Sequence, residues 1–436
     1  MSTTERSRVE YVTDPAAAMS RLAGADRFGE YVMYERPGEW VFAADPIGSI
    51  ELDVQELRVT WAGQTTSGRW EGNPAGVIDR ALGTLALEGR NTYGWIGFEF
   101  CAWTLDATRH LDPGTSLVRL MIPRIEVRVG EFGVRVAGAT PAETGDIHDL
   151  IAQSQNTELP QAHMVDVRVD PTGYRDRVAE AIGEIRARRY QKVILSRKVD
   201  LPFAVDVPAT YRLGRAYNTP ARSFLLRLGG LEAAGFSPEL VASVDDDRVV
   251  TTEPLAGTRA FGRGDAVDTA AREDLITDPK EIVEHAISVQ TALAEISAIA
   301  DPGTPVVSDF MAVRERGSVQ HLASIVRGRL AADRSSWDAL EALFPSVTAS
   351  GIPKRAGVDS VFRLDHDPRD LYSGAVVIVS PTGALEATLV LRAVYQNADG
   401  AWLRAGAGIV GQSRPEREFE ETCEKLDSIA PYVVRA

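Results

Sequence analysis

The sequence predicts an α+β fold, and three observations lead to this prediction. Short β-rich runs follow one another across turn signals, and their short gaps favour hairpins and therefore antiparallel pairing. Longer segments with apolar residues at helical spacing stand beside these runs. The regular alternation of strand and helix that a parallel sheet needs is not seen in the pattern.

The N-terminal part, residues 1–160, reads mainly as strands. We expect one helix at residues 73–88, where Asn73 and Pro74 form a start signal. The polar, turn-rich segment 142–161 is the expected boundary, although both sides of it would form one compact unit. The expected strands are 31–34, 40–43, 57–61, 94–100, 117–121, 125–129 and 133–136.

The remainder, residues 161–436, combines further strands with three long helices. The best marked helix is 279–299, because Asp278 and Pro279 suit its N-cap and first turn. The other two helices are expected at 171–188 and 415–429. The expected strands are 193–200, 223–228, 239–244, 249–252, 375–379, 387–396 and 401–405.

Composition limits the partners of the 436-residue chain. It has 47 Lys and Arg against 62 Asp and Glu, a net charge of −15 that argues against a nucleic-acid-binding surface but allows an anionic small molecule. Cys101 and Cys423 lie too far apart for a metal spacing or a disulfide framework. No apolar run suits a membrane helix or a signal peptide. We therefore expect a cytoplasmic protein without membrane or nucleic-acid contacts.

Two pairs of glutamates are candidates for a metal site. Glu418 and Glu421 lie with Lys425 on an arc of roughly 60° of the last expected helix. Glu281 and Glu284 lie three residues apart on the helix 279–299. Taken alone, each pair indicates only a solvated helix face, on which Glu421 and Lys425 would form an ordinary i,i+4 salt bridge. Two pairs from two helices would nevertheless suit Mg²⁺, which prefers oxygen ligands.

The glycine pattern formed by Gly406, Gly408 and Gly411 directly follows an expected strand. It matches the dinucleotide-binding motif, but that site also requires a βαβ unit with a later acidic residue, which the sequence does not indicate. A tight turn, or a close approach of the backbone to some other ligand, fits better because glycine has no Cβ.

Three strand-associated groups could carry acid–base or anion chemistry. Lys192 heads an apolar strand, and Glu239 enters another. Such residues are usually solvated or cap a turn, but burial would move both pKa values toward neutrality and provide a base and an acid. Gly257 and Thr258 could offer backbone amides to a carboxylate.

Taken together, these segments resemble the chorismate-utilising enzymes, which include anthranilate, aminodeoxychorismate, isochorismate and salicylate synthases. The motifs EPLAGTR, KEIVEH, GSVQH, LYSGAV, LRAGAGIV and EREFEETCEKL stand in that family's order. The catalytic resemblance covers about residues 165–430 and is closest to the salicylate-forming branch of mycobactin-type siderophore pathways. It implies large antiparallel sheets with outer helices around a central cleft.

The resemblance also implies roles for the candidate residues. Lys192 would be the base that deprotonates the water attacking C2 of chorismate, and Glu239 the acid that protonates the departing C4 hydroxyl. Mg²⁺ would be the cofactor, with two glutamates as direct ligands and two acting through metal-bound water. The direct ligands would be Glu284 and Glu421, and the residues acting through water Glu281 and Glu418.

The substrate-binding residues follow from the same resemblance. Tyr372 and Arg392 would hold the enolpyruvyl carboxylate, which suits the fork of an arginine. His321 would line the same pocket. The remaining implied contacts with chorismate are Gly257, Thr258, Gly406, Gly408 and Lys425.

Departures within the family point to water as the nucleophile. Ammonia-using anthranilate synthases have glutamine at the position of Lys192, and aminodeoxychorismate synthases place a nucleophilic lysine where Ala256 stands. The resemblance favours continuation from isochorismate to salicylate and pyruvate, in a monomer without a glutaminase partner. An isochorismate synthase that releases its product, an ammonia-dependent relative and a catalytically inactive chorismate-binding protein remain alternatives.

Overall fold

The computed structural model describes residues 12–316 and 319–436. The first two residues of the GSVQH motif therefore lie outside the described residues. Within the described ranges, no helix is both long and apolar enough to cross a membrane.

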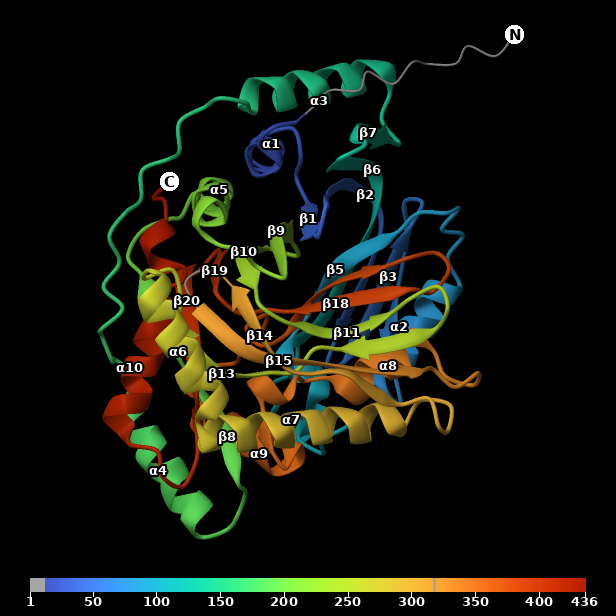
Figure 1. Ribbon diagram of the computed structural model, residues 1–436. Helices are drawn as coiled ribbons and strands as arrows, with labels where there is room; N and C mark the ends of the chain where they lie inside the picture. The colour runs from blue at the N-terminus through green and yellow to red at the C-terminus, as the bar shows by residue number, and fades with distance from the viewer. Residues whose placement is uncertain (1–11, 317–318) are drawn as a thin grey trace.

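Strand β2 (Glu39–Asp53) joins two arms of antiparallel strands (Figure 1). The first arm continues from it in the order of hydrogen-bonded neighbours β1 (Tyr31–Arg36), β9 (Arg222–Leu228), β10 (Leu231–Ser237), β19 (Ala393–Asn397), β20 (Gly400–Ile409), β8 (Lys192–Leu201) and β16 (Gly351–Ile352). The hairpin of β3 (Glu56–Trp61) and β4 (Gln64–Arg69) extends the far half of β2.

The second arm leaves β2 on its other side. Its strands are, in order of pairing, β6 (Ser116–Gly130), β5 (Thr92–Ile96), β17 (Ala375–Val379), β18 (Leu385–Leu389), β11 (Leu240–Val244), β12 (Val249–Thr252) and β15 (Val319–Arg329). Strand β15 also pairs with β13 (Leu255–Ala260) and β14 (Val306–Arg316), and β6 with β7 (Gly133–Ala137). The α+β class with large antiparallel sheets is confirmed.

A buried apolar cluster lies between the two arms. Val32 and Phe224 come from the first arm, and Tyr93 and Val376 from the second, yet they belong to one cluster. A larger cluster fills the outer faces, where the helices pack. Both faces of the central strands are therefore buried, which explains their nearly continuous apolar sequences.

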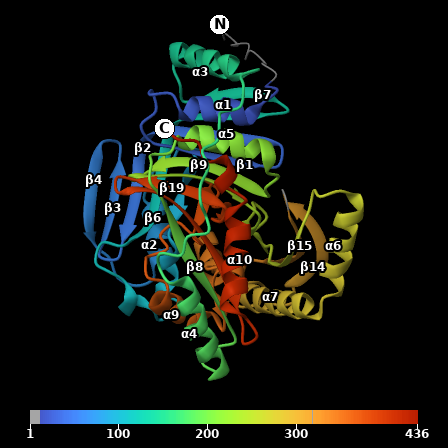
Figure 2. The ribbon, with the colours of Figure 1, turned by 90° about the vertical axis from the view of Figure 1, so that its left-hand side faces the viewer.

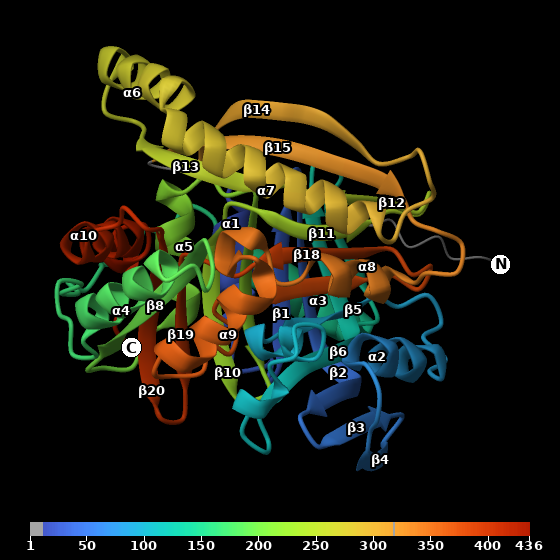
Figure 3. The ribbon, with the colours of Figure 1, turned by 90° about the horizontal axis from the view of Figure 1, so that it is seen from below.

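The helices cover these outer faces in groups. The first arm carries α1 (Pro15–Ala23), α3 (Pro141–Ser154) and α5 (Val207–Tyr217) at one end. Two further helices, α4 (Tyr174–Arg186) and α10 (Pro415–Leu426), lie along β8 and β20 (Figure 2). The remaining helices of the described ranges are α2 (Pro74–Gly83), α6 (Asp265–Thr277), α7 (Pro279–Ser297), α8 (Ser336–Leu343) and α9 (Lys354–Leu364). Figure 3 shows α7 lying along β13–β15.

The segment 142–161 differs from the expected turn-rich boundary, because most of it is helix α3. Thr140 and Glu143 form a reciprocal capping box, and Pro141 occupies the first turn. Ile147 and Ile151, one turn apart, are buried. These signals stabilise the helix despite its polar composition. The division of the chain at residues 160 and 161 stays a prediction, and β1–β9 and β5–β17 pair across it.

Two expected strand patterns also differ in detail. The runs 117–121 and 125–129 form the single strand β6, with a register shift close to where Pro46 and Pro123 lie opposite each other. Neither proline has an N–H to give to the ladder, so an irregularity is expected there. The run 387–396 is instead divided into β18 and β19, because Arg392 has a left-handed backbone with φ 51°.

Candidate active site

Lys192 is the first residue of β8, and its side chain is buried. Its Nζ donates a hydrogen bond to Oε1 of Glu284 on α7 at 2.5 Å, which joins the first arm to a helix of the second. The neighbouring strand β20 leaves room for this side chain at Gly408. A Cβ on Gly408 would lie 3.1 Å from Lys192 Cε, a tighter distance than most real contacts. Gly408 therefore allows a close approach of β20 to the Lys192 side chain, while the expected approach of this backbone to a ligand stays a prediction.

Glu239 lies between β10 and β11 and is only 1% exposed. Its Oε1 accepts hydrogen bonds from Ser346 Oγ at 2.5 Å and from Thr348 Oγ1 at 3.1 Å, whereas Oε2 has no partner among the described residues. Burial raises the pKa of Glu239 from 4.5 to about 8, although the two hydroxyls and the charge of Lys192 act in the opposite direction. The carboxyl is thus mostly protonated at neutral pH.

The four candidate glutamates influence one another across α7 and α10. Burial raises the pKa of Glu281, and the nearby Glu284 raises it further. Burial also raises the pKa of Glu418, and Glu421 adds to this. Burial and the charge of Glu421 on α10 both act to raise the pKa of Glu284 on α7, but the Lys192 ammonium brings that pKa below its usual value. Four carboxylates therefore share one electrostatic environment.

Each carboxylate of this group except Glu418 has an ion-pair partner in the described structure. Glu421 Oε1 lies 2.9 Å from Lys425 Nζ, and Glu281 Oε1 lies 3.3 Å from Arg259 Nη1. Within residues 12–316 and 319–436, no three His, Cys, Asp or Glu side chains gather tightly enough to hold a metal ion. Because Mg²⁺ takes only one or two protein carboxylates and keeps water ligands, the oxygen-only set still fits such a cation.

A second group of side chains is suited to hold an anion. His321 on β15 lies opposite Thr258 on β13. Its Nε2 lies 2.9 Å from Arg392 Nη2, which can only donate, so Nε2 accepts and the ring proton is on Nδ1. Nδ1 donates to the carbonyl of Gly257 at 3.1 Å. Burial, followed by the charge of Arg392, lowers the pKa of His321 to about 3. The neutral ring therefore orients the guanidinium.

Tyr372 and Lys425 meet at Gly406 of β20. Lys425 Nζ donates to the carbonyl of Gly406 at 2.8 Å, and a Cβ on Gly406 would lie 3.0 Å from the Tyr372 hydroxyl. The structure thus links most of the sequence-predicted residues in three groups, around Lys192, His321 and Gly406, whereas the Glu239 carboxyl is held by Ser346 and Thr348. Arg259, Ser346 and Thr348 contact this set but were not singled out from the sequence.

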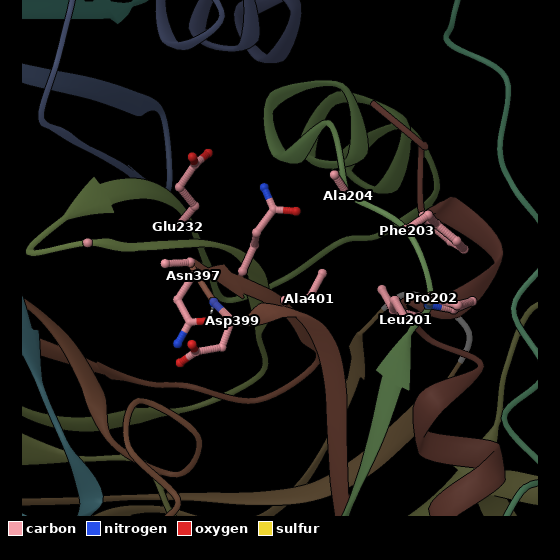
Figure 4. A pocket seen from close by; sticks show the side chains of 12 residues that line it. Leu201, Pro202, Phe203, Ala204, Glu232, Asn397, Asp399 and Ala401 are labelled. Carbon is pink, nitrogen blue, oxygen red and sulfur yellow. Dashed lines mark hydrogen bonds between the residues drawn. The ribbon is translucent and has the colours of Figure 1, made fainter.

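The structure also has a surface hollow of about 610 Å³ (Figure 4). Pro202 and Phe203 line one side, and residues 396–401 of the β19–β20 hairpin line the other. None of the candidate residues borders it. It therefore has no part in the chemistry considered for Lys192 and Glu239.

The whole chain is similar to known proteins. The family model for chorismate binding enzyme matches residues 30–431. The chain is 54% identical to a salicylate synthase from Mycolicibacterium paratuberculosis over 424 residues, covering 97% of this chain and 94% of the relative.

Solved structures support the same fold. An anthranilate synthase component I from Streptococcus pneumoniae TIGR4 superposes with a TM-score of 0.76 at 22% identity, covering 90% of this chain and 92% of the other. The menaquinone-specific isochorismate synthase from Escherichia coli superposes with a TM-score of 0.73 at 21% identity, covering 95% and 91%.

Proposed function

The chain belongs to the family of chorismate binding enzymes, and on this basis we propose that it is a salicylate synthase that converts chorismate to isochorismate and then to salicylate and pyruvate. The observation that carries the proposal is 54% identity to a salicylate synthase along nearly the whole of both chains. We further propose that the salicylate serves the biosynthesis of a mycobactin-type siderophore.

In the first reaction, Lys192 and Glu239 act as base and acid. Lys192 takes a proton from the water whose oxygen bonds to C2 of chorismate. Glu239 gives its proton to the C4 hydroxyl, which leaves with the electron pair of the C–O bond as water. The raised pKa of Glu239 supports the acid role, because the carboxyl retains its proton at neutral pH. One water enters and one leaves, so the reaction is an isomerisation.

Mg²⁺ would be held by Glu284 and Glu421, with Glu281 and Glu418 acting through water. Bound there, the cation would neutralise the ring carboxylate of chorismate and replace the Lys192 ammonium as the partner of Glu284. The mutual repulsion of the four carboxylates and the raised pKa values of Glu281 and Glu418 support a cation at this place. The backbone at Gly257 and Thr258, with Lys425, would hold the same carboxylate.

In the second reaction, isochorismate loses pyruvate by transfer of a hydrogen within the substrate. Such a step depends on the conformation of the bound molecule and needs no further acid or base. Arg392 and Tyr372 would hold the enolpyruvyl carboxylate, and the hydrogen bond from Arg392 to His321 supports a fixed guanidinium. The set of residues therefore serves both reactions without a second site.

The test is to incubate the purified protein with chorismate and Mg²⁺ in a buffer without ammonium, and to separate the products by chromatography with fluorescence detection. We expect salicylate and an equimolar amount of pyruvate, both abolished by a chelator. Isochorismate alone would make the protein an isochorismate synthase that releases its product. Failure to consume chorismate would overturn the enzymatic proposal.

A further inference from the structure

The loop that follows helix α8 brings two hydroxyl groups to one oxygen of Glu239. Ser346 is buried, and its Oγ lies 2.5 Å from Glu239 Oε1. The same Oγ accepts a hydrogen bond from the backbone N–H of Thr348 at 3.3 Å. Since that interaction uses a lone pair, the single hydroxyl proton of Ser346 is free to be donated to Oε1.

The hydroxyl of Thr348 has two possible acceptors. Its Oγ1 lies 3.1 Å from Glu239 Oε1 and 3.2 Å from the carbonyl oxygen of Leu255. It has one proton, so it donates to one of them at a time. Within the described residues, the Ser346 hydroxyl donates to Glu239 Oε1 alone, and at a shorter distance of 2.5 Å. The hydroxyl of Ser346 is therefore the more constant hydrogen-bond donor to Glu239 Oε1.

The rest of the surroundings hold the loop and the glutamate backbone in place. Ser350 Oγ donates to the carbonyl of Ser346 at 2.9 Å, whereas the hydroxyls that donate to the Glu239 side chain are those of Ser346 and Thr348. The backbone N–H of Leu389 on β18 donates to the carbonyl of Glu239 at 3.1 Å. Both ends of the Ser346–Glu239 contact are thus anchored independently of it.

The two carboxyl oxygens of Glu239 consequently differ. Oε1 accepts from a hydroxyl, whereas Oε2 is buried and has no partner in the part of the chain that the structure describes. The hydroxyl oxygen of a carboxylic acid is a poorer acceptor than its carbonyl oxygen. A donor directed at Oε1 therefore favours the form of the acid that carries its proton on Oε2.

We propose that Ser346 is a positioning residue for the acid in the isochorismate-forming step: its hydroxyl holds Oε1 of Glu239, so that Oε2 carries the proton and delivers it to the departing C4 hydroxyl. The inference rests on the proposed function. As the C–O bond breaks, its electron pair goes to the hydroxyl oxygen, which takes the Oε2 proton and leaves as water. Glu239 becomes a carboxylate, and the Ser346 hydroxyl stabilises the charge.

The charged and titratable groups around Glu239 define the pH behaviour of this arrangement. Glu253, which precedes β13, raises the pKa of Glu239, and Lys192 of β8 lowers it. The hydrogen bonds from Ser346 and Thr348 also lower it, against the larger effect of burial. Removing the Ser346 hydroxyl should therefore raise the pKa of Glu239 and move the alkaline limb of the kcat profile to higher pH.

The experiment compares Ser346→Ala, Ser346→Thr and the control Ser350→Ala with the unsubstituted enzyme, by kcat, KM and the pH profile of chorismate consumption. For Ser346→Ala we expect kcat to fall about 10- to 100-fold, as for loss of one hydrogen bond to a charged group, with KM little changed. The alkaline limb should move up by about one pH unit. Ser346→Thr should restore much of kcat and the original limb. Ser350→Ala should keep the original limb, because it removes only support for the loop.

Two results would overturn the positioning role: a kcat of Ser346→Ala within about twofold of the unsubstituted enzyme, or a lower kcat with an unmoved alkaline limb. If Ser346→Ala does not fold, the pair Ser346→Thr and Ser346→Val, which differ only in a hydroxyl, decides the question. Equal kcat values for that pair would refute the proposal. An unsubstituted protein that does not consume chorismate would instead refute the proposed function.

Discussion

Replacing Glu239 by glutamine should make the protein more stable at alkaline pH. The folded protein raises the pKa of this carboxyl from 4.5 to about 8 by burial. Below pH 4.5 the group is protonated in both the folded and the unfolded chain, so it does not bias folding. As the pH rises, the unfolded chain ionises first, and stability is lost until the folded form also ionises near pH 8. Glutamine cannot ionise and removes this loss.

The magnitude follows from the two pKa values. One unit of pKa difference corresponds to about 1.4 kcal/mol, so the full effect approaches about 5 kcal/mol above pH 8. Between about pH 5 and pH 9 the expected change is about 4 kcal/mol. Any difference in hydrogen bonding between glutamate and glutamine adds a term that does not vary with pH, so it cancels when the two pH values are compared.

The assay is urea denaturation of both proteins at a series of pH values, with the free energy of unfolding extrapolated to zero denaturant. The advantage of Glu239→Gln over the unsubstituted protein should grow steadily from acid to alkaline pH. The same variant should form no isochorismate, because it has no proton to give. A stability difference that is constant over this pH range would refute the reasoning, since it would mean that Glu239 titrates normally in the folded protein.

Three further substitutions test other parts of the site. Lys192→Ala should abolish isochorismate formation, measured by chromatography, while its circular dichroism spectrum shows an intact fold. Near-normal turnover would contradict the assignment of Lys192 as the base. Gly408→Ala should lower kcat about tenfold or more, since its Cβ would lie only 3.1 Å from Lys192 Cε. The control Gly411→Ala would make only an ordinary contact at 3.6 Å, so its kcat should be nearly unchanged. Glu421→Ala should raise the Mg²⁺ concentration needed for half-maximal activity. It should also weaken the binding of Mn²⁺, measured by electron paramagnetic resonance. The control Glu424→Ala, on the exposed side of the same helix, should change neither quantity.

Local signals in the sequence were sufficient for many elements. Asp278 caps α7 and Pro279 opens it, as the dipeptide predicts. The run 375–379 is a strand with the predicted bounds. Helix α3 had an equally local signal in Thr140 and Glu143, but its polar composition concealed it. For this helix the capping signal predicts the structure better than the composition does, because two buried isoleucines are sufficient to anchor a short amphipathic helix.

The partners of the site residues could not be read from local patterns. Lys192 and Glu284 are 92 positions apart, and their contact depends on how α7 lies along the second arm. Ser346 is 107 positions from Glu239. Hydroxyl residues in a turn are common, and only burial beside a carboxyl distinguishes Ser346 from a turn residue. The sequence predicts the reactive groups, while the tertiary fold decides which of them meet.

The pairing of strands that are distant in the sequence has a consequence for folding during synthesis. Strand β5 ends at Ile96, but its partner β17 begins only at Ala375, so the second arm stays open until most of the chain has been synthesised. Chains with such non-local pairings fold slowly, and unpaired strand edges favour aggregation. A ribosome that stalled before Ala375 would release a chain with the edge of β5 exposed. We therefore expect shortened chains to need chaperones or to be degraded, whereas the completed chain buries this edge.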